Sequence, residues 1–215
     1  MKLESFKSRT RVKICGITRV EDALGAAKLG VDALGLVFYE KSPRNVSAQQ
    51  AQTICAQLPG FVSSVGLFLN PDHSWVEQVL SEVELDLLQF HGTESAQFCA
   101  SFGRPYIKAL GIKGVDDISA LVGQYAAARS VLLDSHRSGE AGGSGEAFDW
   151  LSIPESLRGD IVLAGGLNAD NVAQAIQQVR PFAVDLSSGV ETSPGVKDIN
   201  LMMRLMSEVK RVDCE

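Results

Sequence analysis

The 215-residue chain is 45% hydrophobic and 21% charged, which is typical of an ordered globular protein and excludes disorder as its main state. Lys and Arg number 20 against 26 Asp and Glu, and the resulting net charge of −6 has the wrong sign for a protein that binds the phosphate backbone of nucleic acid. No apolar stretch approaches the roughly 20 residues that cross a bilayer, so we expect neither a nucleic-acid partner nor a membrane segment.

Residues 1–10 are expected to form a basic lead-in, and the folded domain is predicted at 11–215. A secretory signal requires an apolar segment after its basic residues, and no such segment follows here. The four cysteines, at positions 15, 55, 99 and 214, have the spacing of neither a zinc site nor a disulfide framework. We therefore expect a cytoplasmic protein that holds no metal.

Short β-rich runs alternate with amphipathic helical patterns along the chain. Eight strands are predicted, at Arg11–Ile17, Ala33–Tyr39, Val62–Leu69, Leu87–His91, Tyr106–Leu110, Ser130–Asp134, Ile161–Ala164 and Ala183–Leu186. Seven helices are predicted, at Glu21–Leu29, Ala48–Leu58, Ser74–Val83, Ser95–Phe102, Asp117–Tyr125, Ala169–Val179 and Asp198–Val212. Ser47 begins a capping box, and Thr93 and Asn168 are the predicted N-caps of two later helices.

The last predicted helix carries an apolar stripe that is expected to face the core. Its members recur every three or four residues: Ile199, Met202, Met203, Leu205, Met206 and Val209.

Eight strand–helix units of about 27 residues each are near the lower size limit of a (β/α)8 barrel. An open doubly wound sheet is the alternative, but sheets of that kind use about five strands, whereas the alternation here continues to the C-terminus. The chain is therefore predicted to be α/β, a single (β/α)8 TIM barrel. The Gly/Ser-rich stretch 136–148 follows the sixth strand without periodicity, and we expect it to be a mobile loop over a site.

Catalytic groups of such barrels lie where strands end, and two reactive side chains occupy such positions. Cys15 ends the first strand before a glycine, and its thiolate can take a proton or attack a carbon, favoured by the nearby Lys13. Asp134 ends the sixth strand after three apolar residues. Because an unpaired charge is costly in a core, this carboxylate is not expected to fill the core, and it can deliver a proton. Each also has a plain interpretation, as a small buried hydrophobe for the cysteine and as a loop cap for the aspartate.

Tight glycine-containing loops follow the last two strands and are predicted to bind phosphate. They expose backbone N–H groups and two hydroxyls, and the candidate residues are Gly165, Gly166, Ser187, Ser188 and Gly189. Either loop alone would be interpreted as a tight turn. Two at successive strand ends favour an anion site.

Further candidates for substrate contact are Arg44, Gln89, His91 and Asp185. Arg44 follows a proline in the loop after the second strand, where a guanidinium can hold a carboxylate through two hydrogen bonds. It can equally be an ordinary solvated arginine. His91 is either a satisfied buried histidine or a donor that lines the site, and the sequence leaves both open.

Nine segments, in this order, resemble phosphoribosylanthranilate isomerase, the (β/α)8-barrel enzyme of tryptophan biosynthesis. The resemblance covers about residues 11–212. The segments are Lys13-Ile-Cys-Gly-Ile-Thr18, Gly35-Leu-Val-Phe38, Ser42-Pro-Arg44, Val65-Gly-Leu-Phe68, Gln89-Phe-His-Gly92, Leu132-Leu-Asp-Ser135, Gly142-Gly-Ser-Gly145 with Phe148-Asp-Trp150, Leu163-Ala-Gly-Gly-Leu167 and Asp185-Leu-Ser-Ser-Gly-Val-Glu191.

The resemblance implies an Amadori rearrangement of N-(5-phosphoribosyl)anthranilate to an aminoketose phosphate, with no cofactor. It implies that Asp134 is the general acid on the ring oxygen and that Cys15 is the general base at C2. It also implies that Arg44 holds the anthranilate carboxylate and that the two glycine loops hold the phosphate. We expect a monomer, with a dimer left open.

Two other functions remain open on the sequence. One is a different phosphosugar isomerase or epimerase, although those that use two aspartates need Asp where Cys15 stands. The other is a binding module for phosphate ligands without catalysis, which thermal stabilisation by ligand without turnover would support.

Overall fold

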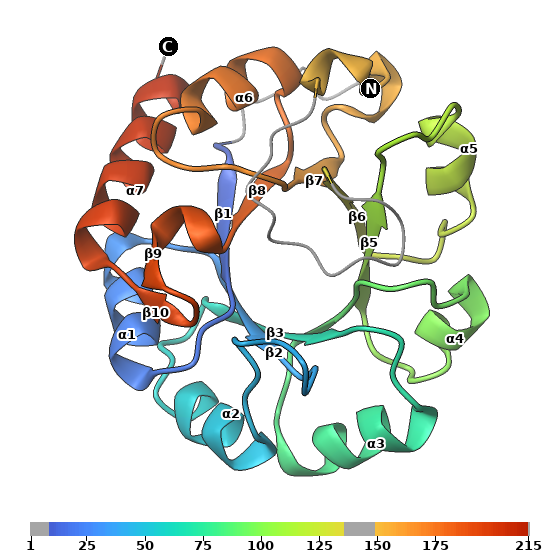
Figure 1. Ribbon diagram of the computed structural model, residues 1–215, viewed down its shortest axis with the longest axis vertical. Coiled ribbons are helices and arrows are strands. Elements are labelled where there is room, and N and C mark those ends of the chain that lie inside the picture. The colour runs from blue at the N-terminus through green and yellow to red at the C-terminus, as the bar shows by residue number, and fades with distance from the viewer. Residues whose placement is uncertain (1–8, 136–148, 215) are drawn as a thin grey trace, which may run out of the picture.

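The computed structural model describes residues 9–135 and 149–214. Eight parallel strands pair in sequence order and close into a barrel, and the helices form a ring around it (Figure 1). The predicted (β/α)8 fold is thus confirmed. The predicted loop at 136–148 and most of the basic lead-in lie outside the described residues.

The barrel strands are short, within the usual length range of strands in globular proteins. They are β1 (Arg11–Cys15), β2 (Ala33–Val37), β3 (Ser63–Phe68), β4 (Leu87–Phe90), β5 (Tyr106–Gly111), β6 (Ser130–Asp134), β7 (Ile161–Leu163) and β8 (Ala183–Leu186). The barrel closes where β1 pairs with β8, from Arg11 opposite Ala183 to Ile14 opposite Leu186. Every strand therefore has two neighbours and no edge remains open.

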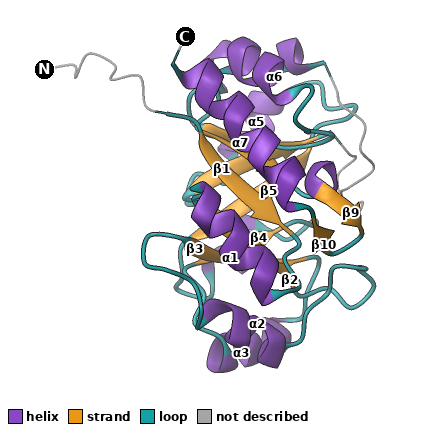
Figure 2. Cartoon of the chain, turned by 90° about the vertical axis from the view of Figure 1, so that its left-hand side faces the viewer, coloured by secondary structure: helices purple, strands orange, loops and turns teal. Residues whose placement is uncertain are grey.

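The helices cover the outer face of the strands (Figure 2). They are α1 (Val20–Leu29), α2 (Ala48–Cys55), α3 (His73–Glu82), α4 (Ala96–Ala100), α5 (Ile118–Gly123), α6 (Val172–Val179) and α7 (Ile199–Asp213). Three short 3₁₀ helices lie at Trp150–Ser152, Glu155–Leu157 and Ser188–Val190. Within the described ranges, no helix has both the length and the apolar content needed to cross a membrane.

One of the three predicted N-caps, Ser47, is confirmed by the structure. Ser47 forms the full capping box on α2, with Gln50 as its partner. Thr93 and Asn168 are not caps, because α4 begins after Ser95 and α6 after Asn171. Thr93 instead bonds to Asn70, and the Asn168 side chain accepts a hydrogen bond from the N–H of Asp170, so both polar groups are used in the loops.

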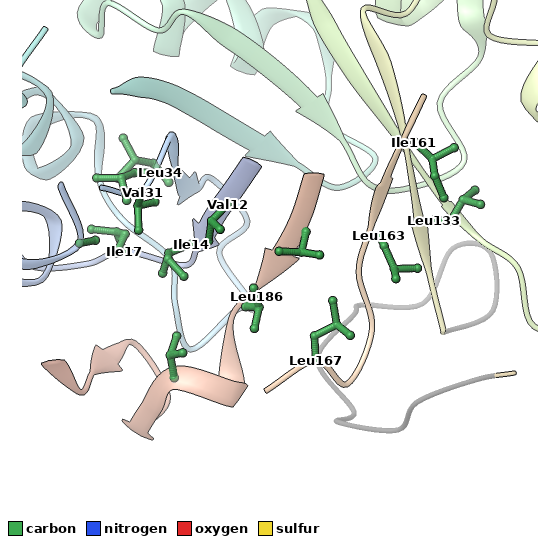
Figure 3. Close-up of a cluster of buried hydrophobic side chains, with 14 of the residues drawn as sticks. Val12, Ile14, Ile17, Val31, Leu34, Leu133, Ile161, Leu163, Leu167 and Leu186 are labelled. Atoms are coloured by element: carbon green, nitrogen blue, oxygen red, sulfur yellow. The ribbon is translucent and has the colours of Figure 1, made fainter. Parts of the chain in front are cut away.

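Side chains of each strand alternate between the outer core and the barrel interior. Val12 and Ile14 face the outer core, where they belong to one buried cluster with Leu163 and Leu186 (Figure 3). The intervening positions of β1, Lys13 and Cys15, are left to the interior. The predicted stripe of α7 is partly wrong, since Ile199 and Met203 are about half exposed while its other four members are buried.

An unpredicted hairpin follows the last barrel strand. Its strands are β9 (Glu191–Ser193) and β10 (Val196–Lys197), and it lies beside the C-terminal end of β1 (Figure 1). At the other end of β1, the N–H and hydroxyl of Thr10 bond to the Asp213 carboxylate at 2.8 and 2.7 Å. The first strand is thus held at both ends by the last segment of the chain.

Candidate active site

A pocket opens at the C-terminal ends of the strands, where the sequence places the reactive side chains. It is lined by Cys15, Val37, Tyr39, Lys41, Ser42, Pro43, Arg44, Leu67, Leu69, His91, Asp134, Ala164, Gly165, Gly166, Leu167, Asp185, Leu186, Ser187 and Ser188. Cys15 and Asp134 therefore face one space, although 119 positions separate them. Nine of the eleven predicted site residues line it, and the exceptions are Gln89 and Gly189.

Cys15 is 6% exposed and lies beside an ion pair of the barrel interior. Lys13 donates to Asp185 Oδ1 at 2.9 Å, and both side chains are buried. Gly35 on β2 leaves the room for this arrangement, because a Cβ there would lie 2.6 Å from the Cys15 sulfur and 3.0 Å from Lys13 Nζ. Burial raises the pKa of the Cys15 thiol, and the ammonium of Lys13 offsets only part of that rise.

Asp134 faces the pocket next to His91, whose Nε2 lies 3.7 Å from Asp134 Oδ2. On the other side of the ring, Gln89 Nε2 lies 3.0 Å from His91 Nδ1. When the amide donates there, Nδ1 is the accepting nitrogen and Nε2 carries the hydrogen toward Asp134. Gln89 is fully buried behind His91, so its place is that of a support for the ring rather than of a pocket wall.

Arg44 reaches the pocket from the loop after β2, but it is not solvated. Its Nε lies 2.9 Å from Glu191 Oε1 and its Nη2 lies 2.7 Å from Glu191 Oε2. Burial alone would raise the pKa of Glu191, yet the hydrogen bonds from Arg44 and Lys197 outweigh it and lower that pKa. The guanidinium therefore has one carboxylate partner within the protein and still borders the pocket.

The two glycine loops lie side by side at the ends of β7 and β8. Gly165 and Gly166 have φ of +89° and +63°, which side chains rarely adopt. A Cβ at Gly165 would meet the Ser135 N–H nitrogen at 2.6 Å, and one at Gly189 would meet the Leu167 carbonyl oxygen at 2.1 Å. Glycine is thus required at 165 for the close approach to the end of β6 and at 189 for the close approach of the two loops, and Gly165, Gly166, Ser187 and Ser188 line the pocket.

Comparison with known proteins bears on what this pocket does. Residues 12–208 match the family model described as N-(5'-phosphoribosyl)anthranilate (PRA) isomerase. The chain belongs to this family. The N-(5'-phosphoribosyl)anthranilate isomerase of Pseudomonas putida GB-1 is 54% identical over 204 residues, covering 95% of this chain and 99% of that protein. The enzyme of Pseudomonas fluorescens Pf-5 is 55% identical over 201 residues, covering 94% of this chain and 96% of its own length.

Solved isomerase structures have the same fold. The enzyme of Thermotoga maritima is 42% identical with a TM-score of 0.85, covering 94% of this chain and 99% of its own. A phosphoribosylanthranilate isomerase in complex with reduced 1-(o-carboxyphenylamino)-1-deoxyribulose 5-phosphate is 40% identical with a TM-score of 0.82 and the same coverage. A further structure, 39% identical with a TM-score of 0.82, holds generated monomers of the dimeric Thermotoga maritima enzyme.

Sequence reasoning missed two buried charged residues, Lys197 and Glu191, which contact the lining residues Cys15 and Arg44 but do not themselves line the pocket. Lys197 Nζ lies 2.6 Å from both the Cys15 carbonyl oxygen and Glu191 Oε1, and its side chain is fully buried. Glu191 was noted only as the end of a motif. Nothing in the sequence around Lys197 marks it, because a two-residue strand has no periodicity and its partners lie far away in the chain. In the described part of the chain, no group of three or more His, Cys, Asp or Glu side chains forms a metal site.

Proposed function

We propose that the protein converts N-(5'-phosphoribosyl)anthranilate to 1-(2-carboxyphenylamino)-1-deoxyribulose 5-phosphate, with Asp134 as general acid and Cys15 as general base. The observation that carries the proposal is the single pocket that both side chains border, between the glycine loops and Arg44. Membership of the isomerase family supports the reaction, and the pocket supports the roles of the residues.

The order of proton transfers follows from the chemistry. Asp134 protonates the ring oxygen of the ribose, the ring opens, and a protonated imine forms at C1. Only then is the C2 proton acidic enough for removal by the Cys15 thiolate. The resulting enol takes up a proton at C1 and releases its C2 hydroxyl proton, which forms the C2 carbonyl of the aminoketose. No electron acceptor is needed, because the oxidation of C2 and the reduction of C1 balance within the substrate.

The remaining pocket residues bind and orient. Arg44 faces the anthranilate carboxylate, and Gly165, Gly166, Ser187, Ser188 and Gly189 form the phosphate cradle. Asp185 fixes Lys13 beside the thiol, and Gln89 fixes the ring of His91 beside Asp134. The enzyme is a monomer and works in the cytoplasm, where its four free cysteines stay reduced.

The test is a fluorescence assay of purified protein with N-(5'-phosphoribosyl)anthranilate and, in parallel, with other sugar phosphates. Cys15→Ser and Asp134→Asn are each expected to slow turnover by about 10²- to 10⁴-fold, as is usual for a lost general base or acid, with unchanged melting curves. Cys214→Ser and Asp170→Asn, which alter exposed groups outside the pocket, serve as controls.

Wild-type protein that binds the substrate without turning it over would overturn the proposed reaction and favour the binding module. Full activity of either pocket variant would remove that residue from its role. The molar mass, measured by light scattering during size-exclusion chromatography, tests whether the protein is a monomer.

A further inference from the structure

The hairpin β9–β10 carries a charged pair into the interior of the active-site end. Lys197 is paired with Glu191 across the hairpin, and their side chains are 0% and 4% exposed. Buried ion pairs are poor sources of stability, since desolvation of the two charges consumes most of their attraction. What this pair contacts is therefore more informative than its own strength.

Glu191 holds one edge of the guanidinium of Arg44. Nε and Nη2 both point at the carboxylate, in the two-bond geometry that fixes a guanidinium in orientation as well as in position. Among the described residues, no hydrogen bond to Nη1 is found. The nitrogen that remains for a ligand is thus set by Glu191.

Lys197, the partner of Glu191, contacts the end of β1 and the loop after β8. Its Nζ contacts the Cys15 carbonyl oxygen at 2.6 Å, the Ser187 carbonyl oxygen at 3.3 Å and Ser187 Oγ at 3.4 Å. Gly16 lies between these loops, because a Cβ there would be 2.5 Å from Arg44 Cδ and 3.1 Å from Ser187 Oγ. Three loops far apart in sequence therefore meet at one pair of charges.

We infer that Glu191 is a positioning residue of the isomerase, which presets Arg44 for the substrate carboxylate and, through Lys197, aligns the strand end of Cys15 with the Ser187 loop. The inference rests on the proposed roles of Arg44 and Cys15. Its physical basis is preorganisation: a guanidinium already fixed by one carboxylate loses less rotational freedom when it binds a second.

The direct test is a double-mutant cycle with Glu191→Gln, Arg44→Met and the double variant, assayed with N-(5'-phosphoribosyl)anthranilate. Glu191→Gln keeps the volume of the side chain but removes the charge, and its KM is expected to rise on the order of tenfold. Because Glu191 acts on the carboxylate through Arg44, its effect on KM should vanish once Arg44 is replaced. If the KM of the double variant instead rises by the product of the two single-variant factors, the two residues act independently and the inference is overturned.

Asp22→Asn is the matched control for a merely structural role. Asp22 also anchors the hairpin, since its Oδ2 accepts from the Lys197 backbone N–H at 3.1 Å, but no hydrogen bond or ion pair joins it to Arg44 or Cys15 in the described structure. It should lower the melting temperature without raising KM. An equal rise of KM in Asp22→Asn would show that loosening of the hairpin alone explains the effect.

A second variant and substrate keep the inference testable if Glu191→Gln does not fold. Glu191→Met/Lys197→Met replaces both charges by apolar side chains, which buried pairs often tolerate. The part of its KM defect that arises at Arg44 should disappear with N-(5'-phosphoribosyl)aniline, which lacks the carboxylate, and the defect that remains should match that of Lys197→Met, which reports on the Ser187 loop. An undiminished KM defect with the aniline substrate would overturn the role of Glu191 toward Arg44. Absence of wild-type turnover would instead overturn the proposed function.

Discussion

Cys15 is a buried thiol whose surroundings act on its ionisation in opposite senses. Removal from water raises its pKa, and the ammonium groups of Lys13 and Lys197 reduce that rise without cancelling it. A raised thiol pKa leaves less thiolate at neutral pH, and thiolate is the reactive form. The reaction of Cys15 with an alkylating reagent is therefore expected to be slow near pH 7 and to accelerate as the pH rises beyond the ordinary thiol range of about 8.5.

The measurement is pulsed labelling with iodoacetamide between pH 6 and about 10, read by mass spectrometry of the cysteine peptides. The exposed Cys214 is the internal reference. Faster labelling of Cys15 than of Cys214 at pH 7 would show that the nearby ammonium groups dominate over burial. Cys55 and Cys99, whose burial raises their pKa to about 11, should also label more slowly than Cys214.

Gly189 tests the close approach of the two loops that we propose to bind phosphate. Because its Cβ would meet the Leu167 carbonyl oxygen at 2.1 Å, Gly189→Ala must push the loops after β7 and β8 apart. We expect weaker binding of inorganic phosphate and a rise of KM by about tenfold, with a smaller change in kcat. Calorimetric titration with phosphate measures the first effect. Gly159→Ala, with open space around its Cβ, is the control and should bind phosphate like the wild type.

Residues at strand ends were predictable because the fold brings all C-terminal ends to one face, whatever their distance in sequence. Cys15, Asp134 and the glycine loops were therefore predicted at one face, and residues of all of them line one pocket. The internal partner of Arg44 could not be predicted, since its contact with Glu191 spans 147 positions. Gln89 was predicted as a substrate contact but does not line the pocket, because alternation along β4 puts residues 89 and 91 on one side and does not tell which is nearer the opening.

At the scale of elements, the capping box of α2 gives a clean stability prediction. The Ser47 hydroxyl accepts from the Gln50 N–H at 3.1 Å, and Gln50 Oε1 accepts from the Ser47 N–H at 3.0 Å. Ser47→Ala leaves one helix N–H without its protein partner, and we expect a loss of about 1 kcal/mol in the free energy of unfolding. Urea denaturation measures it, with Ser81→Ala near the end of α3 as the control. A loss below about 0.3 kcal/mol would mean that water replaces the hydroxyl fully.

Strands and long helices were predictable, whereas their ends and the shortest elements were not. Eight apolar runs were enough to count the barrel strands, because a strand that is buried on both faces of the sheet needs apolar residues. The predicted helix at Ser95–Phe102 began at the right place, but the N-caps Ser95 and Asn171 were missed, since several nearby polar residues can cap equally well by composition. The hairpin β9–β10 has too few residues for any period, and its formation depends on tertiary contacts of Lys197.

At the scale of the whole molecule, the first strand and the last helix are joined without a covalent link. Thr10 and Asp213 form two hydrogen bonds, so the described ends of the chain are close together at the end of the barrel away from the pocket. A circular permutant that begins at Gly60, ends at Pro59 and joins Cys214 to Arg9 through a short Gly/Ser linker is expected to fold and to keep its activity.

The new termini fall in an exposed loop before β3, where Phe61 is fully exposed. Circular dichroism melting and kcat/KM measure the outcome, with a permutant opened between Gly189 and Val190 as the comparison. That second permutant cuts a pocket loop and should lose activity. Equal activity of the two would mean that continuity of this loop is unimportant.

The barrel has one seam that is shorter than the others. β7 has three residues, and only two of them, Val162 and Leu163, are in register with β8. The loops that follow these two strands form the proposed phosphate cradle. A phosphate group that bridges them would hold this seam together, so ligand binding should slow deuterium exchange of the backbone amides of β7 and β8 more than that of the amides of β2 and β3, which share five register pairs. The substrate would thereby reinforce the shortest strand pairing of the cylinder that binds it.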